Sequence, residues 1–225
     1  MNNDEMKRLA AKKALEYLWD GMLLGVGTGS TVEIFIEELK RNREKFKNIS
    51  CVASSIKTKD ILEKNGFKVV DLEDKLDLYI DGADAVDEDL NLIKGGGGAL
   101  TREKITAFNS KKNIIIVDET KLRSNIFDIW VPVEILQYSW KATQKRIHEI
   151  GFKSEIREIG KKPFLTDNGN YILDVDLKNS DDPIHEGLDL KNIPGVVETG
   201  IFKNLADILI IGEKNGNVRL INKTV

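Results

Sequence analysis

The segment from Asp81 to Lys104, DGADAVDEDLNLIKGGGGALTREK, gathers acids, bases and glycines at a density that no structural requirement explains. Moving a proton beside a carbonyl group requires a carboxylate base, a cation that stabilises the resulting oxyanion, and backbone that can approach the substrate closely. The segment supplies these residue types, with Glu103 as the candidate base and Lys94, just before the glycines, as the candidate cation. We therefore expect proton-transfer chemistry on a small anionic substrate.

Each of these residues also has an ordinary explanation when it is taken alone. Asp81 and Asp84 flank Gly82 at the end of an apolar run, and aspartates commonly serve turns and caps. Glu103 falls in the first turn of an expected helix, where the helix dipole stabilises any carboxylate. A pair of aspartates could also suggest Mg²⁺, but carboxylates alone do not define a metal site, and the two histidines lie in unrelated helical segments. We therefore expect no metal dependence.

A second glycine-rich segment, GVGTGST at residues 25–31, lies where the first expected strand turns into a helix. Glycines let backbone amides approach a ligand and a helix N-terminus favours an anion, so we expect a phosphate here. The segment is neither a Walker loop nor a good dinucleotide fingerprint, because no Gly-Lys-Ser/Thr follows and Ser30 replaces the third glycine. The alternative is a tight turn with a serine cap. Lys121 comes just after the expected strand 113–118 and so lies at the same edge of the expected sheet. Taken alone, it would be a solvated loop lysine.

Alternating helix and strand patterns surround these segments and predict how they are positioned. Apolar spacing predicts a first helix that is capped by Asn3 or Asp4 and runs to Leu18. Strands are expected at 22–27, 50–54, 68–72, 76–81 and 113–118, and helices at 31–39, 57–65 and 100–109. This order indicates an α/β fold with a doubly wound, mostly parallel, Rossmann-like sheet. Ligands in such sheets bind outside the carboxyl ends of the strands.

The pattern changes after residue 129. Strands at 130–134, 153–158, 170–176 and 195–202, with helices at 138–150 and from Asp182-Pro183, have the β-α-β-β-α-β order of a small α+β ferredoxin-like domain. A hairpin of 206–213 and 217–222 is expected to return to the first sheet, with a continuous C-terminal domain as the alternative. The expected large domain is therefore discontinuous, comprising residues 1–129 and 203–225, and the small domain comprises 130–202.

Bulk composition excludes several classes of function. The 225 residues carry a net charge of −3, and their basic side chains are scattered, so we expect no nucleic-acid partner. Cys51 is the one cysteine and cannot form an intrachain disulfide, which indicates a reducing compartment. The start of the chain lacks a secretory pattern, and no apolar run approaches the roughly 20 residues of a membrane helix. We expect a cytoplasmic protein without membrane contact.

Taken together, these motifs resemble ribose-5-phosphate isomerase of the A type. The matching blocks follow the family order over nearly the whole chain, and KGGGGALTREK is highly diagnostic. They are GVGTGST (25–31), ASSIKT (53–58), DLYIDGAD (77–84), NLIKGGGGALTREKI (91–105), VDETKL (117–122), PVEI (132–135), PFLTDNGNYILD (163–174) and IPGVVETGIF (193–202). Two positions depart from the family pattern: Ala85 stands where glutamate is common, and Gly98 where alanine is also common.

The resemblance implies interconversion of ribose 5-phosphate and ribulose 5-phosphate through an enediolate, in the pentose phosphate pathway, without metal or organic cofactor. It implies a homodimer or a dimer-based homotetramer. Glu103 would move the proton between C2 and C1, Lys94 would stabilise the oxyanion, and Asp81 and Asp84 would contact sugar hydroxyls and help open the furanose ring. The implied substrate-binding residues are Thr28, Gly29, Ser30, Thr31, Asp81, Gly82, Ala83, Asp84, Lys94, Gly95, Gly96, Gly97 and Lys121.

Two other classes of function remain open from the residues. A related enzyme on a similar sheet could be an acyl-coenzyme A transferase, with a covalent glutamate, or an amino-sugar phosphate deaminase. Neither His148 nor His185 lies in a matching block, which counts against the deaminase because it would be expected to use a catalytic histidine. A non-catalytic sugar-phosphate sensor is the third class.

Overall fold

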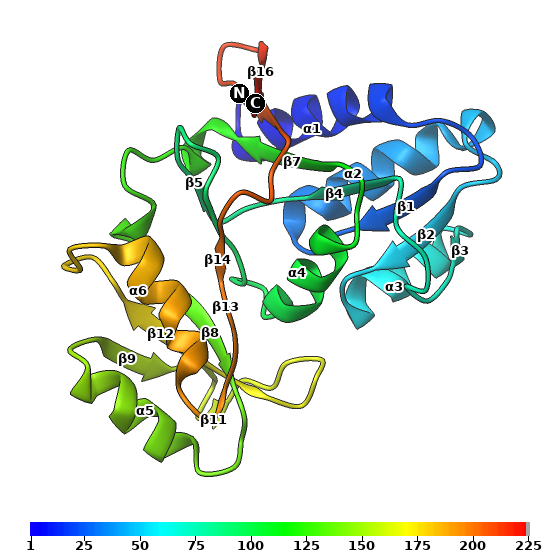
Figure 1. The fold of residues 1–225 in the computed structure, drawn as a ribbon. Coiled ribbons are helices and arrows are strands. Elements are labelled where there is room, and N and C mark those ends of the chain that lie inside the picture. Colours follow the sequence, from blue (N-terminus) through cyan, green and yellow to red (C-terminus); the bar gives the residue numbers. More distant parts are fainter. Residues whose placement is uncertain (224–225) are drawn as a thin grey trace.

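The computed structural model describes residues 1–223 and contains a seven-stranded sheet, ordered β16-β15-β7-β4-β1-β2-β3 (Figure 1). All neighbouring strands are parallel except β15 and β16, which form an antiparallel hairpin. The strands are β1 (Leu23–Val26), β2 (Ser50–Ala53), β3 (Lys68–Val69), β4 (Leu78–Asp81), β7 (Asn113–Asp118), β15 (Ile208–Gly212) and β16 (Val218–Asn222). The expected α/β class and the return of the hairpin to this sheet are therefore confirmed.

Both faces of this sheet are covered, which explains its continuous apolar strands. Along β7, Ile114 and Ile116 join the core under the first two helices, whereas Ile115 and Val117 pack on the opposite face. The helices of this part are α1 (Asn3–Ala14), α2 (Ser30–Arg41), α3 (Ile56–Lys64) and α4 (Leu100–Phe108). Helices α1 and α2 lie side by side. Helix α2 follows β1 directly, so its N-terminus lies at the carboxyl edge of the sheet.

The expected cap of the first helix was wrong. Asn2 is the N-cap, because its side chain accepts a hydrogen bond from the amide of Glu5 at 2.9 Å and the Glu5 carboxylate accepts one from the Asn2 amide at 2.8 Å. This reciprocal capping box starts the helix earlier than a cap at Asn3 or Asp4 would. The helix also ends earlier, at Ala14, and a 3₁₀ turn follows at Leu15–Tyr17. Further 3₁₀ turns occur at Arg43–Lys45, Glu119–Lys121, Ile126–Asp128 and Leu190–Asn192.

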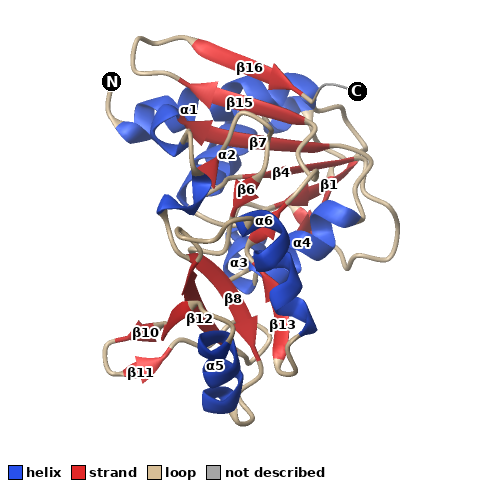
Figure 2. Cartoon of the chain, turned by 60° about the vertical axis from the view of Figure 1, so that its left-hand side comes forward, coloured by secondary structure: helices blue, strands red, loops and turns tan. Residues whose placement is uncertain are grey.

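A second, antiparallel sheet has the order β13-β8-β12-β9, which is the strand order of a ferredoxin-like fold (Figure 2). Its strands are β8 (Val131–Ile135), β9 (Lys153–Ile156), β12 (Tyr171–Asp176) and β13 (Val196–Thr199), and its helices are α5 (Trp140–Glu149) and α6 (Pro183–Asp189). Asp182 caps α6 and Pro183 takes its first position, as the sequence predicted. A short hairpin, β10 (Glu158–Ile159) with β11 (Lys162–Pro163), was not expected.

The strand expected at 195–202 is divided at Gly200. After β13, the chain continues as β14 (Ile201–Phe202), which pairs in a separate small sheet with β6 (Leu92–Ile93), itself paired with β5 (Ala85–Val86). Gly200 donates to the Pro132 carbonyl at 2.6 Å and accepts from the Lys94 amide at 2.9 Å, so it links the two neighbouring sheets. The division into residues 1–129 with 203–225, and 130–202, stays a prediction. Within residues 1–223, no helix has the length and apolar character needed to cross a membrane.

Candidate active site

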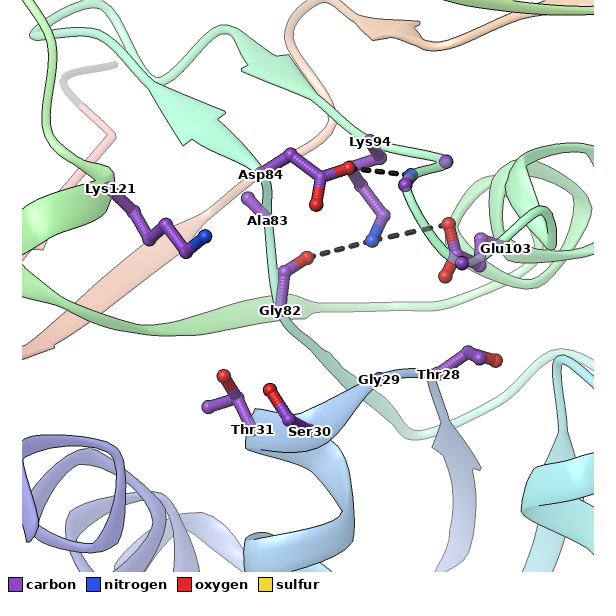
Figure 3. Close-up of a pocket in the computed structure, with 13 residues that line it drawn as sticks. Thr28, Gly29, Ser30, Thr31, Gly82, Ala83, Asp84, Lys94, Glu103 and Lys121 are labelled. Carbon is purple, nitrogen blue, oxygen red and sulfur yellow. Dashed lines mark hydrogen bonds and ion pairs between the residues drawn. The ribbon is translucent and has the colours of Figure 1, made fainter. Parts of the chain in front are cut away.

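A pocket lies at the carboxyl ends of β1, β4 and β7, beside the N-termini of α2 and α4 (Figure 3). It contains about 440 Å³ of empty space, part of which is open to solvent. Its lining residues are Thr28, Gly29, Ser30, Thr31, Gly82, Ala83, Asp84, Lys94, Gly95, Gly96, Gly97, Glu103 and Lys121. All the catalytic and substrate-binding residues that the resemblance implied line this pocket, except Asp81.

The Lys94 ammonium lies at the centre of a buried network of charges. Its Nζ atom is 2.7 Å from the Asp81 carboxylate, 2.7 Å from the Gly82 carbonyl oxygen, and 3.3 Å from Oε2 of Glu103. The three charged side chains are almost completely buried, although Lys94 and Glu103 both reach the pocket wall. A carboxylate and an ammonium are therefore held side by side at one end of the pocket.

The local charges shift the pKa of both groups. Burial and the negative charge of Asp81 raise the pKa of Glu103 to about 8, and the Lys94 ammonium only partly offsets this rise. Burial lowers the pKa of Lys94, but attraction to Asp81 and Glu103 outweighs it, so the pKa lies above its usual range. Lys94 thus stays a cation at neutral pH, while Glu103 can exchange a proton near neutral pH, as a general acid–base group requires.

Asp81 lies behind the pocket wall and holds the wall in place. It is fully buried and accepts hydrogen bonds from the amides of Thr28 at 3.1 Å and Gly82 at 2.7 Å, and from the Tyr79 hydroxyl. A Cβ atom at Gly27 would stand 2.0 Å from the Asp81 carboxylate, so this close approach requires glycine there. Asp81 therefore contacts Lys94 and the two loops, whereas Asp84 faces the pocket.

The four-glycine loop is held from both sides. Asp84 accepts from the Gly96 amide at 2.7 Å, and Arg157 donates to the carbonyls of Gly95 at 2.7 Å and Gly96 at 3.2 Å. Sequence reasoning missed Arg157, because it lies 62 residues from Gly95 and has no local motif. Gly98 has φ +81°, and a Cβ there would lie 2.3 Å from the Phe164 ring. Alanine, which the family resemblance gives as also common at this position, would therefore strain this structure.

The opposite end of the pocket suits an anion. Gly29 precedes the first turn of α2 without a capping side chain, so the amides of that turn remain available to a ligand. The hydroxyls of Ser30 and Thr31 and the ammonium of Lys121 point into the same space (Figure 3). Lys7, which the sequence did not single out, donates to the Ser30 hydroxyl at 3.1 Å and adds positive charge nearby.

The family described as Ribose 5-phosphate isomerase A (phosphoriboisomerase A) matches residues 50–216. The chain belongs to this family. Ribose-5-phosphate isomerase A of Bacillus mycoides is 45% identical over 214 residues, which cover 94% of this chain and 97% of that protein. Two solved structures of the family are similar over the whole fold. Ribose 5-phosphate isomerase of Plasmodium falciparum is 36% identical, with a TM-score of 0.94, and the match covers 99% of this chain and 100% of that one. A D-ribose-5-phosphate isomerase in complex with phospho-erythronic acid is 39% identical, with a TM-score of 0.93 and the same coverage.

Proposed function

We propose that Glu103 and Lys94 carry out the isomerisation of ribose 5-phosphate to ribulose 5-phosphate, the reaction of the family to which this chain belongs, through an enediolate. The observation that carries the proposal is the buried Glu103–Lys94 pair in the pocket wall, with 3.3 Å between Oε2 and Nζ. Abstracting a proton beside a carbonyl group creates an oxyanion, so a carboxylate base next to a cation is the minimal arrangement for this reaction.

The pocket suggests how the substrate is oriented. The phosphate would lie at the N-terminus of α2, among the Ser30 and Thr31 hydroxyls and the Lys121 ammonium, where backbone amides and positive charge favour an anion. This places the opposite end of a five-carbon chain beside Glu103 and Lys94. Binding of the remote phosphate then positions the reacting carbons. The phospho-erythronic acid in a family structure, a short phosphorylated polyhydroxy acid, supports this class of ligand.

The proposed chemistry begins with the open-chain aldose. The Glu103 carboxylate takes the proton from C2, and the electron pair moves into the C1 carbonyl, whose oxygen gains negative charge beside Lys94. Proton exchange between the two enediolate oxygens then moves the negative charge to O2. Return of the Glu103 proton to C1 gives the ketose. Asp84, which faces the pocket from the loop after β4, is placed to contact sugar hydroxyls and to assist ring opening.

Three oxygen atoms surround the Lys94 ammonium: a carboxylate oxygen of Asp81, the Gly82 carbonyl oxygen, which accepts a hydrogen bond, and Oε2 of Glu103, which forms an ion pair without a hydrogen bond. The contact with Glu103 is the longest of the three. When Glu103 takes the substrate proton it becomes neutral, so its attraction to Lys94 weakens. The ammonium then becomes available to the oxyanion at the step where negative charge develops on the substrate.

We also propose a homodimer or a dimer-based homotetramer in the cytoplasm. Several large apolar side chains are exposed, among them Phe108 at 76% and Tyr138 at 87%, and such side chains are commonly covered in oligomer interfaces. The single cysteine, Cys51, is buried and free, which suits a reducing compartment. Sedimentation equilibrium of the purified protein measures the oligomeric state, and a monomer at all concentrations would contradict this part of the proposal.

Conversion of ribose 5-phosphate by the purified protein in excess chelator tests the reaction, the absence of a metal requirement and the base together. We expect turnover by the wild type and a loss of at least about 10²-fold in Glu103→Gln, with substrate binding retained, because this change removes the general base but keeps its shape. Unchanged turnover in the variant would remove Glu103 from the mechanism. Binding without any turnover by a folded wild type would favour a sensor, and a thioester trapped on Glu103 would favour an acyl-coenzyme A transferase.

A further inference from the structure

Four consecutive residues at the start of α4, 101–104, contact either the pocket or the ferredoxin-like unit. The elements of that unit run from β8 to β13. Glu103 faces the pocket. Thr101 donates to the Glu134 carboxylate on β8, Arg102 binds Asn168 and the Asp167 carbonyl at 2.8 Å each, and Lys104 binds Glu198 of β13 at 2.8 Å. The residues on either side of the proposed base are therefore all held by the neighbouring unit.

Glu134 is the centre of these contacts. It is fully buried, and its carboxylate accepts hydrogen bonds from the Thr166 hydroxyl at 2.8 Å and from the side-chain amides of Asn170 at 2.9 Å and Asn168 at 3.1 Å, besides Thr101. No ion pair within residues 1–223 involves Glu134. A buried carboxylate with neutral donors alone costs desolvation energy, so its presence indicates a role that an apolar residue could not fill.

The same contacts explain two sequence blocks to which the proposed mechanism gives no role. The block PVEI contributes Glu134, and PFLTDNGNYILD contributes the three donors that surround it, together with Phe164, which packs against Gly98. Both blocks come from the ferredoxin-like unit, whereas Glu103 and Lys94 come from the part that contains the seven-stranded sheet. The 164–170 loop, through Glu134, thus fixes the N-terminal turn of the helix that carries the proposed base.

We infer that Glu134 is a positioning residue for Glu103, acting through Thr101 and the 164–170 loop on the first turn of α4. The inference rests on the proposed function of Glu103. Glu134 does not line the pocket. It acts by holding the Glu103 carboxylate at a fixed distance from Lys94 and from C1 and C2 of the substrate, and displacement of a catalytic group by about 1 Å can cost about 10²-fold in rate.

A double-mutant cycle in the full-length protein tests the inference. Glu134→Gln keeps the shape but directs an amide group at donors, so it disturbs the cluster. We expect kcat for ribose 5-phosphate to fall by about 10–10²-fold with little change in KM, because the binding residues of the phosphate are untouched. In a Glu103→Gln background the same change should cause no further loss, because residues that act as a unit are not additive. Losses that multiply in the double variant would overturn the inference.

Two further variants keep the test decisive if Glu134→Gln does not fold. Thr101→Val removes only the hydrogen bond from α4 to Glu134, and it should reproduce the fall in kcat with KM unchanged. Glu38→Gln is the matched control, because Glu38 is also a buried carboxylate that joins two helices, through Arg8, and its ion pairs, with Arg8 and Arg41, do not involve α4. It should lower the unfolding temperature without changing kcat. A folded Thr101→Val protein with wild-type kcat would overturn the inference. Failure of the proposed function itself would appear separately, as a wild type without turnover or a Glu103→Gln variant with full activity.

Discussion

The Oε2 atom of Glu103 lies 3.3 Å from the Nζ atom of Lys94 but has no hydrogen-bond partner among the described residues. Both side chains are at least 95% buried, with exposed fractions of 5% and 3%. An unpartnered carboxylate oxygen in such a position is expensive in a structural ion pair, because buried polar atoms are normally hydrogen-bonded. It is suitable for a base, because the carboxylate is paired with Lys94 without a hydrogen bond that would have to break before it takes a proton.

Replacing Lys94 tests the cation. We expect Lys94→Ala to lower kcat by roughly 10²–10³-fold, the usual cost of removing an oxyanion-stabilising group. Lys94→Met is the companion variant, because it keeps most of the volume of the side chain while removing the charge. Steady-state kinetics on both proteins, with folding checked by circular dichroism, measure the effect. An effect confined to KM would make Lys94 a binding residue only.

The raised pKa of Glu103 predicts the pH dependence of the reaction. The carboxyl group must be ionised to accept a proton, and its pKa is raised to about 8 in the folded protein by burial and by Asp81. We therefore expect kcat/KM to rise with pH and to level off above pH of about 8, because this ratio reports ionisation of the free enzyme. A midpoint at the ordinary value for glutamate, about 4.3, would contradict the proposed assignment.

Asp81→Asn should move this midpoint, because the negative charge of Asp81 is one cause of the raised pKa of Glu103. Without that charge the pKa of Glu103 falls, so the acid limb of kcat/KM shifts to lower pH. The variant should also be less stable by about 3–5 kcal/mol, since it removes one partner of a buried ion pair. Urea denaturation and the pH–rate profile measure the two effects. Asp84→Asn is a useful comparison, because Asp84 contributes less to the pKa of Glu103 than Asp81 does.

Lys121→Ala tests the proposed orientation of the substrate. If Lys121 contacts the phosphate, KM for ribose 5-phosphate should rise by roughly 10-fold or more, since a hydrogen bond to a charged group contributes about 1.5–3 kcal/mol. Unphosphorylated ribose supplies the control, because wild type and variant should bind it equally. Equal losses for ribose and ribose 5-phosphate would place Lys121 at the sugar instead.

The sequence predicted the positions of the site loops because those positions depend on local signals. Apolar strands followed by Gly27 or Gly82 mark the carboxyl edge of a parallel sheet, and the start of α4 places Glu103 in its first turn. The alternation of strands and helices predicted the sheet for the same reason. The family resemblance supplied the remaining roles, because no local pattern distinguishes Lys121 from an ordinary loop lysine.

Features that depend on distant contacts were not predicted from the sequence. The depth of Asp81 depends on Lys94 and Tyr79, which surround its carboxylate, and nothing in the sequence distinguishes it from Asp84. Arg157, between β9 and β10, reaches the glycine loop from the ferredoxin-like unit. The break at Gly200 was also not predicted: a glycine inside a strand pattern can mark a bend, but it is the bonds of Gly200 to Pro132 and Lys94 that divide the strand.

The contacts at the start of α4 also fix the register of the helix. Each residue of an α-helix is turned by about 100° from the one before it, so inserting or deleting one residue between Gly98 and Thr101 would rotate every side chain of the first turn onto a different neighbour. A one-residue deletion would bring Lys104, and a one-residue insertion Arg102, toward the pocket in place of the carboxylate, and either change would turn Thr101 away from Glu134. The length of the four-glycine loop is therefore as restricted as its composition, although a loop of glycines would ordinarily accept changes in length easily.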